Sequence, residues 1–267
     1  MLAERADAWS EALLSRHSRR SYDGTSAAPE QLTSVQAVCE RFRPHTDARV
    51  ALVEQPGCDV FTGAIGSYGK VTGAPHLLAV IAGDGARSAL HAGYTGEAAV
   101  LEATAAGLDT CWVAGFFDRD VARSVVELEA GERIVAVSPL GRAPARKSGT
   151  ERTFVALAGS RQRKPLRTIA KDVSPRWPEW ALGAVEAARV APSAMNRQPW
   201  RFRFEDGALI LAMDSAGQLP VVRKELDCGI AMLHAEVAAR AYGMDGAWEE
   251  LEDGLDLARW IAKEDPR

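Results

Sequence analysis

Apolar and polar positions along the chain follow helical spacing in some stretches and form short unbroken apolar runs in others. Spacings of three and four residues predict amphipathic helices over residues 3–15 and 29–42. Residues 92–106 are small and apolar on nearly every face, so they predict a buried central helix that ends at Gly107. A helix is also expected at 125–130, and strands are expected at 50–54, 77–82, 108–117 and 134–140. This mixture predicts a fold of the α+β class.

The same pattern occurs twice in the sequence. Residues 93–112 align without a gap on residues 229–248, with seven identities in twenty positions, and both stretches end in Gly-x-Asp-x-x-Trp. Pro29 and Pro178 each open a predicted helix that leads into a bend and a strand. The chain is therefore predicted to contain two tandem copies of one α+β unit, joined by a proline-rich segment. The expected halves are residues 1–173 and 174–267.

A rigid polar bend is predicted at residues 191–200, which read APSAMNRQPW. Pro192 and Pro199 fix their own backbones and keep the residues before them out of the helical region. Ser193 and Asn196 are short polar groups that can either cap a helix or bond a ligand. Two interpretations follow: a capped helix end that leads into the next strand, or a binding element.

Residues 16–20, which read Arg-His-Ser-Arg-Arg, form a basic cluster directly after the first predicted helix. Charge runs of this kind often belong to solvated loops. Guanidinium groups also donate hydrogen bonds in a fork that matches phosphate oxygens, so a phosphate site is the alternative.

Composition limits the kinds of partner and compartment. The chain of 267 residues has a formal net charge of −4 and a pI near 5.8, which argues against nucleic acid or an anionic membrane as its main partner. Its four cysteines lie far apart in no CxxC or Cys/His pattern, so neither a metal site nor a disulfide framework is expected. With no secretory leader and no apolar run long enough to span a bilayer, we expect a cytoplasmic protein.

The bend and the basic cluster together resemble elements of a known family. The bend resembles the APSxxNxQPW motif of FMN-dependent nitroreductases, and residues 16–20 resemble the RxSxR/K element that opens those proteins. The resemblance extends over nearly the whole chain and is nearest to a single-chain subgroup. It implies a nitroreductase-like fold in which two tandem copies form an intramolecular pseudo-dimer, and it favours the binding interpretation of both segments.

The resemblance also implies a set of FMN-binding residues. Lys70 would reach the flavin ring, where a positive charge favours the anionic reduced form. Backbone atoms at the end of the strand predicted at 108–117 would lie beside flavin N5, and late basic residues would hold the phosphate, with Lys164 as an alternative ligand. The residues implied to bind FMN are Arg16, His17, Ser18, Arg20, Lys70, Val113, Ala114, Gly115, Arg161, Arg163, Pro192, Ser193, Ala194 and Asn196. Because the flavin carries the hydride, no side chain is expected to act as an acid or a base.

The distribution of these elements between the halves predicts a single site. In homodimers of this family each flavin lies at the subunit interface, so a site takes elements from both copies of the fold. The N-terminal copy has the RxSxR element, but its residues 42–49 lack the serine and asparagine of the bend. The C-terminal copy has the bend and lacks RxSxR. We therefore expect one FMN per chain, in a monomer that mimics the family homodimer.

The activity implied by the resemblance is that of an NAD(P)H-dependent flavin oxidoreductase. Hydride would pass by a ping-pong mechanism through flavin N5 to a small acceptor such as a nitroaromatic or a quinone, and either NADH or NADPH could be the donor. The alternative is a non-catalytic FMN-binding protein, for storage or sensing, with an occluded flavin. A specialised flavin enzyme, for example a dehalogenase, is a third candidate.

Overall fold

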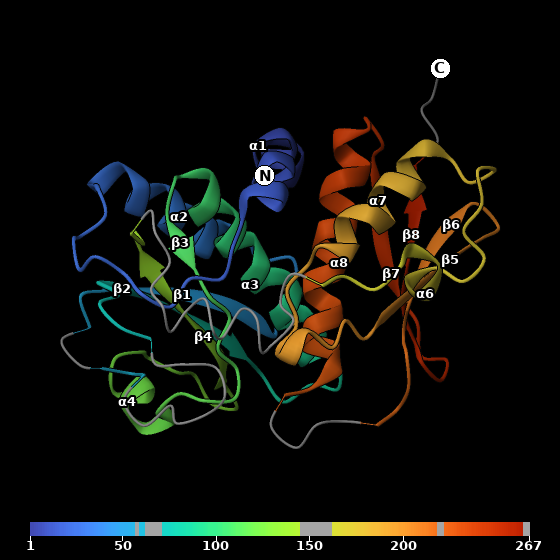
Figure 1. The fold of residues 1–267 in the computed structure, drawn as a ribbon. Coiled ribbons are helices and arrows are strands. Elements are labelled where there is room, and N and C mark those ends of the chain that lie inside the picture. Colours follow the sequence, from blue (N-terminus) through green and yellow to red (C-terminus); the bar gives the residue numbers. More distant parts are fainter. Residues whose placement is uncertain (57–58, 62–70, 145–161, 218–221, 264–267) are drawn as a thin grey trace.

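Two four-stranded antiparallel sheets lie on either side of a central pair of helices, α3 (Ser88–Ala105) and α8 (Lys224–Ala241) (Figure 1). The computed structural model describes residues 1–56, 59–61, 71–144, 162–217 and 222–263. Helices and antiparallel sheets mixed in this way make an α+β fold, as the hydrophobic pattern predicts.

The first sheet has the strand order β1-β2-β4-β3 and is built from the N-terminal part of the chain. Its strands are paired antiparallel throughout. The elements of this part, besides α3, are α1 (Leu2–Ser15), α2 (Pro29–Arg41), β1 (Ala48–Glu54), β2 (His76–Ala82), β3 (Asp109–Thr110), α4 (Arg119–Ser124) and β4 (Arg133–Gly141).

The second sheet has the order β5-β6-β8-β7 and is also antiparallel throughout. Its third and fourth strands along the chain exchange places in the sheet, as they do in the first sheet. The elements of this part, besides α8, are α6 (Leu166–Ile169), α7 (Glu179–Arg189), a 3₁₀ turn (Ala194–Asn196), β5 (Trp200–Glu205), β6 (Ala208–Met213), β7 (Gly246–Glu250) and β8 (Asp256–Ala262).

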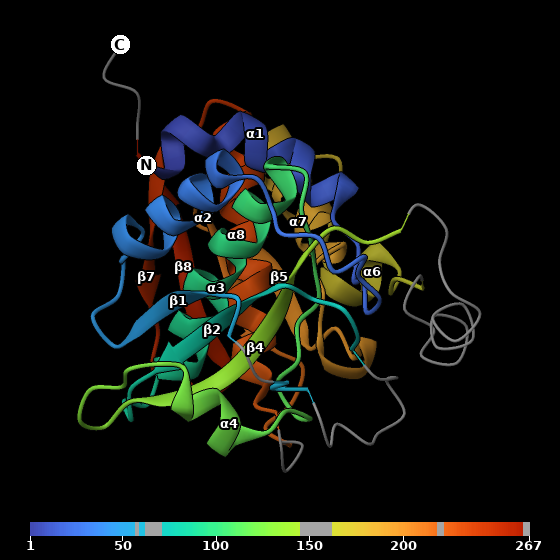
Figure 2. The ribbon, with the colours of Figure 1, turned by 90° about the vertical axis from the view of Figure 1, so that its left-hand side faces the viewer.

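Strand β2 is buried along its whole length because both faces of its sheet are covered. Leu78 packs in one cluster with residues of α2 and α3. The adjacent residue, Leu77, packs in a different cluster with Ala122 of α4. Figure 2 shows α2 and α3 lying across this sheet and α4 at its lower end. A strand covered on both faces reads as a continuous apolar run, which explains the sequence at 77–82.

The central helices cross in backbone contact at two glycines. A Cβ atom on Gly93 of α3 would overlap the carbonyl oxygen of Leu226, and one on Gly229 of α8 would overlap the carbonyl oxygen of Leu90. Both helices have 18 residues, and each glycine is the sixth residue of its helix. Small residues allow helix backbones to approach this closely, so these glycines fix the distance between α3 and α8.

One hydrophobic cluster extends across the central helices into both parts of the chain. Trp9 of α1 and Leu90 of α3 belong to it together with Trp200 of β5 and Trp260 of β8, and all four side chains are fully buried. The core of the second sheet thus continues through α8 into α1 and α3, whereas the buried hydrophobic residues of β1, β2 and β4 belong to other clusters. Large aromatic side chains supply much of the apolar area that α1, α3 and α8 bury together.

The helices and strands agree with the sequence-based predictions except in one region. The helix expected at 125–130 is wrong, because the helical turn is α4, six residues earlier. Asp118 begins it by accepting hydrogen bonds from the backbone N–H groups of Asp120 and Val121, each at 3.0 Å. The strand expected at 108–117 is shorter, since only β3 and a single bridge between Val113 and Val137 pair with β4.

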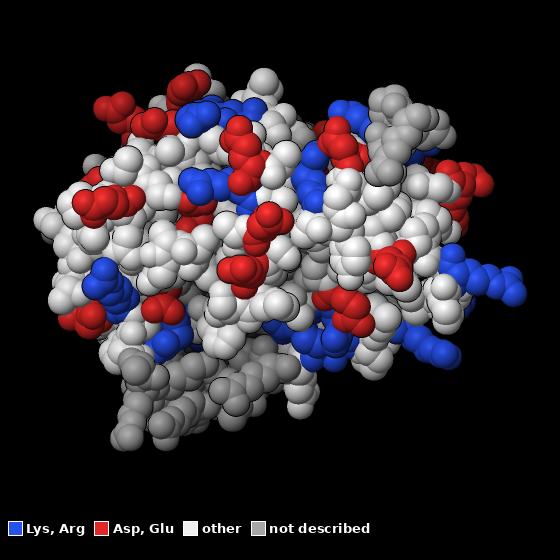
Figure 3. Space-filling model, turned by 90° about the horizontal axis from the view of Figure 1, so that it is seen from above, with Lys and Arg blue, Asp and Glu red and all other residues white. Residues whose placement is uncertain are grey.

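The surface mixes charges of both signs. On the face seen from above, acidic and basic side chains are interspersed (Figure 3). Within the described ranges, no helix combines the length and apolar character that a bilayer crossing requires.

Candidate functional site

The bend at residues 191–200 contains the most unusual backbone in the described structure. Met195 and Asn196 have φ angles of 53° and 54°, and Gln198 has a φ of 47°. Left-handed conformations are uncommon outside glycine, and they persist where surrounding structure enforces them, often at binding sites. The side chain of Met195 is also 61% exposed, which is unusual for a large apolar group. The strain and the exposure mark this bend as a candidate site.

Hydrogen bonds hold the polar groups of the bend in place. Ser193 Oγ accepts from the backbone N–H of Gln198 at 3.0 Å, and no side chain caps the 3₁₀ turn. Asn196 Oδ1 accepts from Arg163 Nη1 at 2.8 Å, and its Nδ2 donates to the carbonyl oxygen of Gln162 at 2.8 Å. The helix-cap interpretation is therefore wrong for these side chains. Asn196 instead ties the bend to the basic segment at 162–164.

Helix α8 supports the bend from beneath. Asp227 accepts a hydrogen bond from the backbone N–H of Ala194 at 3.1 Å and lies 2.7 Å from the guanidinium of Arg197. Burial raises the pKa of the Asp227 carboxyl to about 6, although Arg197 acts in the opposite direction. Pro192 is buried at the start of the bend. The bend is thus fixed at both ends.

Arg163 links the bend to the other part of the chain. Its Nη1 donates to Asn196 and its Nη2 donates to the carbonyl oxygen of Val190 at 3.0 Å. The pKa of Arg163 is lowered from its ordinary value, first by burial and then by the positive charges of Arg16 and Arg189. Arg16, which follows α1, therefore lies close enough to Arg163 for its charge to lower the pKa of Arg163. Two guanidinium groups placed together favour an anionic ligand.

Arg16 is buried and incompletely paired. Only 8% of the residue is exposed, and its Nε lies 4.0 Å from Glu97 Oε1. Its Nη1 donates to Ser18 Oγ at 3.5 Å, but its Nε makes no hydrogen bond to any residue that the structure describes. A buried donor without a partner is rare in folded proteins and commonly marks a ligand position.

A buried carboxylate, Glu97 of α3, holds several parts of this region together. Its Oε2 accepts from Trp112 Nε1 at 2.6 Å, and its Oε1 lies 2.8 Å from His234 Nε2 of α8 as well as near Arg16. Sequence reasoning missed Glu97 and His234. The signal was present, because a carboxylate within a buried helix requires polar partners.

The basic cluster also pairs with neighbouring backbone. Ser18 forms a parallel bridge with Thr110 of β3, and the N–H of Arg19 donates to the Thr110 carbonyl at 2.9 Å. The carbonyl of Arg20 accepts from the N–H of Thr72 at 2.9 Å, and His17 is exposed. The cluster is therefore an ordered connector between α1 and the first sheet, not a freely solvated loop.

The predicted site residues fall into two groups in space. Arg16 is bonded to Ser18, Arg163 is bonded to Asn196, and the charge of Arg16 acts on Arg163. Val113, Ala114 and Gly115 are half-buried in the segment after β3, close in sequence to Trp112 and its bond to Glu97. Lys70 and Arg161 lie outside the described residues.

Lys164, the alternative phosphate ligand, is turned toward the second sheet. Its Nζ donates to the carbonyl oxygen of Gln198 at 3.1 Å and lies 4.0 Å from Asp214. This arrangement favours Arg163 over Lys164 as the anion ligand of the basic segment.

Comparison with known proteins agrees with this architecture. A Thermotoga maritima crystal structure described as a putative nitroreductase aligns with a TM-score of 0.63 at 20% identity, covering 95% of this chain and 93% of its own. A nitroreductase family protein from Clostridium difficile 630 aligns with a TM-score of 0.44 at 21% identity, over 63% of this chain and 98% of its own. An FMN-dependent nitroreductase from Clostridium difficile R20291 aligns with a TM-score of 0.43 at 16% identity, over 51% of this chain and 88% of its own.

No relative is found among curated proteins. The family model described as "Putative TM nitroreductase" matches residues 9–239, which include the second half of α1, all of α3, the bend and most of α8. Because this match covers most of the sequence, the chain belongs to that nitroreductase family.

Proposed function

We propose that the protein is an FMN-dependent NAD(P)H oxidoreductase of nitroreductase type, with one flavin site per chain. The observation that carries the proposal is the electrostatic influence of Arg16 on Arg163, which is hydrogen-bonded to the strained bend. Arg16 follows α1 and Arg163 is bonded to Asn196, so both motifs of the family contribute positive charge to this region. FMN, when bound, supplies the redox chemistry: it accepts hydride from a nicotinamide and passes electrons to an acceptor.

The described residues fit the phosphate end of FMN. A phosphate carries negative charge and several acceptor oxygens, which suits guanidinium groups whose charges act on one another. Arg16 also offers a buried Nε that makes no hydrogen bond within the described part of the chain. Ser18 Oγ lies beside Arg16 Nη1 and can contribute a further hydrogen bond to the same anion.

We propose supporting roles for Asn196 and Ser193 in place of the direct flavin contacts that the family resemblance implies. Both side chains are hydrogen-bonded within the protein, Asn196 to Arg163 and Gln162, and Ser193 to the backbone of Gln198. We assign to Asn196 the orientation of the Arg163 guanidinium, and to Ser193 the closure of the bend. Val113, Ala114 and Gly115 would then present backbone groups to the flavin ring, and Lys70 would tune it.

We propose further that the chain is a tandem pseudo-dimer whose halves are residues 1–173 and 174–267. Three observations support it: the two sheets have corresponding strand orders, the central helices have equal lengths, and Gly93 and Gly229 pack reciprocally. The offset of 136 residues that aligns the two repeated sequences also aligns the first and last residues of α3 with those of α8. The crossing of α3 and α8 would take the place of a subunit interface, and the protein would act as a monomer.

We expect the purified protein to be yellow and to bleach when NADH or NADPH is added without oxygen. Oxidised flavin absorbs near 450 nm and loses that band on two-electron reduction. The measurement is absorbance at this wavelength in an anaerobic cuvette, followed by addition of a quinone or nitroaromatic, which should restore the colour. A sample treated with dithionite provides the fully reduced reference.

Two results would contradict parts of this proposal. A yellow protein that dithionite bleaches and neither nucleotide reduces would instead be a flavin-storage or sensing protein. A colourless protein that does not take up FMN on reconstitution would contradict the flavin site itself.

A further inference from the structure

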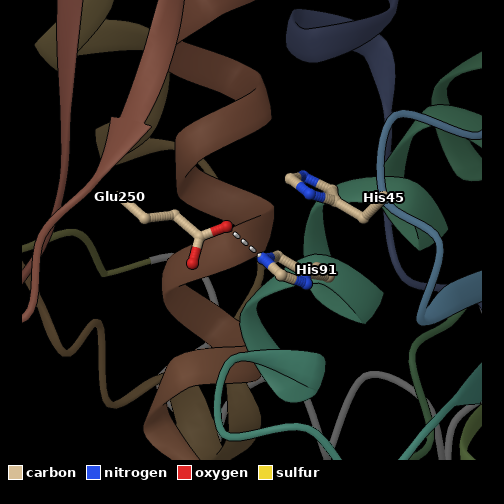
Figure 4. Close-up of side chains that lie close together, drawn as sticks. All are labelled: His45, His91 and Glu250. Carbon is tan, nitrogen blue, oxygen red and sulfur yellow. Dashed lines mark hydrogen bonds and ion pairs between the residues drawn. The ribbon is translucent and has the colours of Figure 1, made fainter.

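Two histidines and a carboxylate lie close together between the two sheets (Figure 4), and a second carboxylate, Asp47, adjoins them. His45 and Asp47 lie in the loop between α2 and β1. His91 is in the first turn of α3, and Glu250 is the last residue of β7. One donor atom each from His45, His91 and Glu250 lie within 4.8 Å of one another. Four side chains from distant segments are thus gathered at one point.

His91 is held between two carboxylates. Its Nδ1 lies 2.6 Å from Asp47 Oδ1, and its Nε2 lies 2.7 Å from Glu250 Oε1. Histidines that bind metals usually donate the second ring N–H to a carboxylate, which fixes the ring and directs the other nitrogen at the ion. Asp47 is placed to do this for His91, leaving Nε2 aimed toward Glu250.

His45 supplies a second imidazole without a hydrogen-bonded partner. Its ring stacks on that of His91, with centroids 3.8 Å apart and an interplanar angle of 4°. Among the described residues its ring nitrogens make no hydrogen bond. Figure 4 shows the two rings side by side, with Glu250 reaching toward His91 from the other sheet.

We propose that His45, His91 and Glu250 bind a divalent metal ion of the zinc class, with Asp47 orienting His91. Two imidazoles and one carboxylate are ligands that zinc accepts, at about 2 Å each. Donor atoms around a tetrahedral ion are then about 3.3 Å apart, and an imidazole nitrogen binds a metal in the plane of its own ring. Because the rings of His45 and His91 are stacked in parallel, binding requires His45 to rotate out of the stack, and His91 and Glu250 to separate slightly. The Glu250 side chain is 41% exposed, and water takes the fourth position from that side.

The position of the cluster gives the ion a structural role. The offset of 136 residues that aligns Gly93 with Gly229 also aligns His91 with Asp227, the residue that supports the bend, and Glu250 with Ala114. In the tandem arrangement that we propose, the cluster therefore lies at the position in one half that corresponds to the bend in the other half. No flavin is expected at the position of the cluster. Because its ligands come from both halves, a bound ion would join them.

Titration of the holoprotein with Zn²⁺, and separately with Co²⁺, tests the site. We expect one ion per chain, a rise in thermal midpoint with Zn²⁺, and visible absorption bands typical of tetrahedral Co²⁺. His91→Gln should abolish these effects. Asp47→Asn should keep the ligands and lower the affinity by about 10- to 100-fold, as loss of a metal ligand's carboxylate partner does.

Glu249→Gln is the matched control, because Glu249 neighbours Glu250 on β7 and pairs instead with Arg259 at 2.7 Å. It should bind metal as the unchanged protein does. Absence of binding at millimolar Zn²⁺, or binding that His91→Gln and His45→Ala leave unaltered, would overturn the proposal. The flavin content of every variant is measured in parallel and should stay constant, which separates failure of the metal site from failure of the flavin site.

Discussion

Arg16→Gln is expected to weaken FMN binding by about 10- to 100-fold, because hydrogen bonds to charged groups each contribute about 1.5–3 kcal/mol. Arg16 is buried, its Nε makes no hydrogen bond to a described residue, and its charge helps to lower the pKa of Arg163. Glutamine keeps an amide donor near the position of the arginine Nε, but it removes the two Nη donors and the charge. The measurement is the dissociation constant for FMN, from the change in flavin fluorescence on titration of the flavin-free protein.

The same titration on other variants separates direct ligands from supporting residues. Arg163→Gln should weaken FMN binding to a similar extent, and Asn196→Ala should weaken it less, because its effect passes through the orientation of Arg163. Arg41→Gln, a charge removal on the exposed end of α2, should leave the dissociation constant unchanged. Equal losses of affinity in His45→Ala and Arg16→Gln would mean that the flavin does not lie where we propose.

Gly229→Ala is expected to lower the free energy of unfolding by about 3 kcal/mol, near the upper end of the usual cost of overpacking. The added methyl group would overlap the carbonyl oxygen of Leu90 and lie 2.8 Å from the backbone N of Tyr94. Backbone atoms within a helix cannot turn away as a flexible side chain can, so α3 and α8 must separate. Unfolding in urea, followed by circular dichroism, measures the loss.

A second glycine variant and a control test whether the loss of stability comes from the separation of α3 and α8. Gly93→Ala should cost a similar amount, and the double variant should cost less than the sum, because both changes separate the same pair of helices. Gly217→Ala places its methyl group in open space and should change the free energy of unfolding by less than about 0.5 kcal/mol. If the glycine variants of α3 and α8 proved as neutral as Gly217→Ala, the close crossing would be incorrect.

Local pattern was sufficient to predict most of the fold. The apolar run at 77–82 predicts a buried strand because β2 is covered on both faces, and the small apolar residues at 92–106 predict α3 because that helix is surrounded. The helix expected at 125–130 is wrong, because the helical turn in this region ends at Ser124. The carboxylate of Asp118 starts the helical turn immediately after itself.

The motifs of the candidate site could be predicted from the sequence, but the contacts between them could not. The sequence identifies the bend and the basic cluster, but the contact between Asn196 and Arg163 depends on how the segments pack. Glu97 pairs with His234, 137 residues away in sequence, and His91 pairs with Glu250, 159 residues away. Side chains so far apart share no local pattern, so only tertiary structure brings them together.

The central claim is that two halves of one chain form a single flavin site. The ratio of FMN to polypeptide, measured on the reconstituted protein together with its mass in solution by light scattering, tests it most directly. We predict one FMN per chain in a monomer. Two FMN per chain, or flavin bound only when two chains associate, would contradict the account.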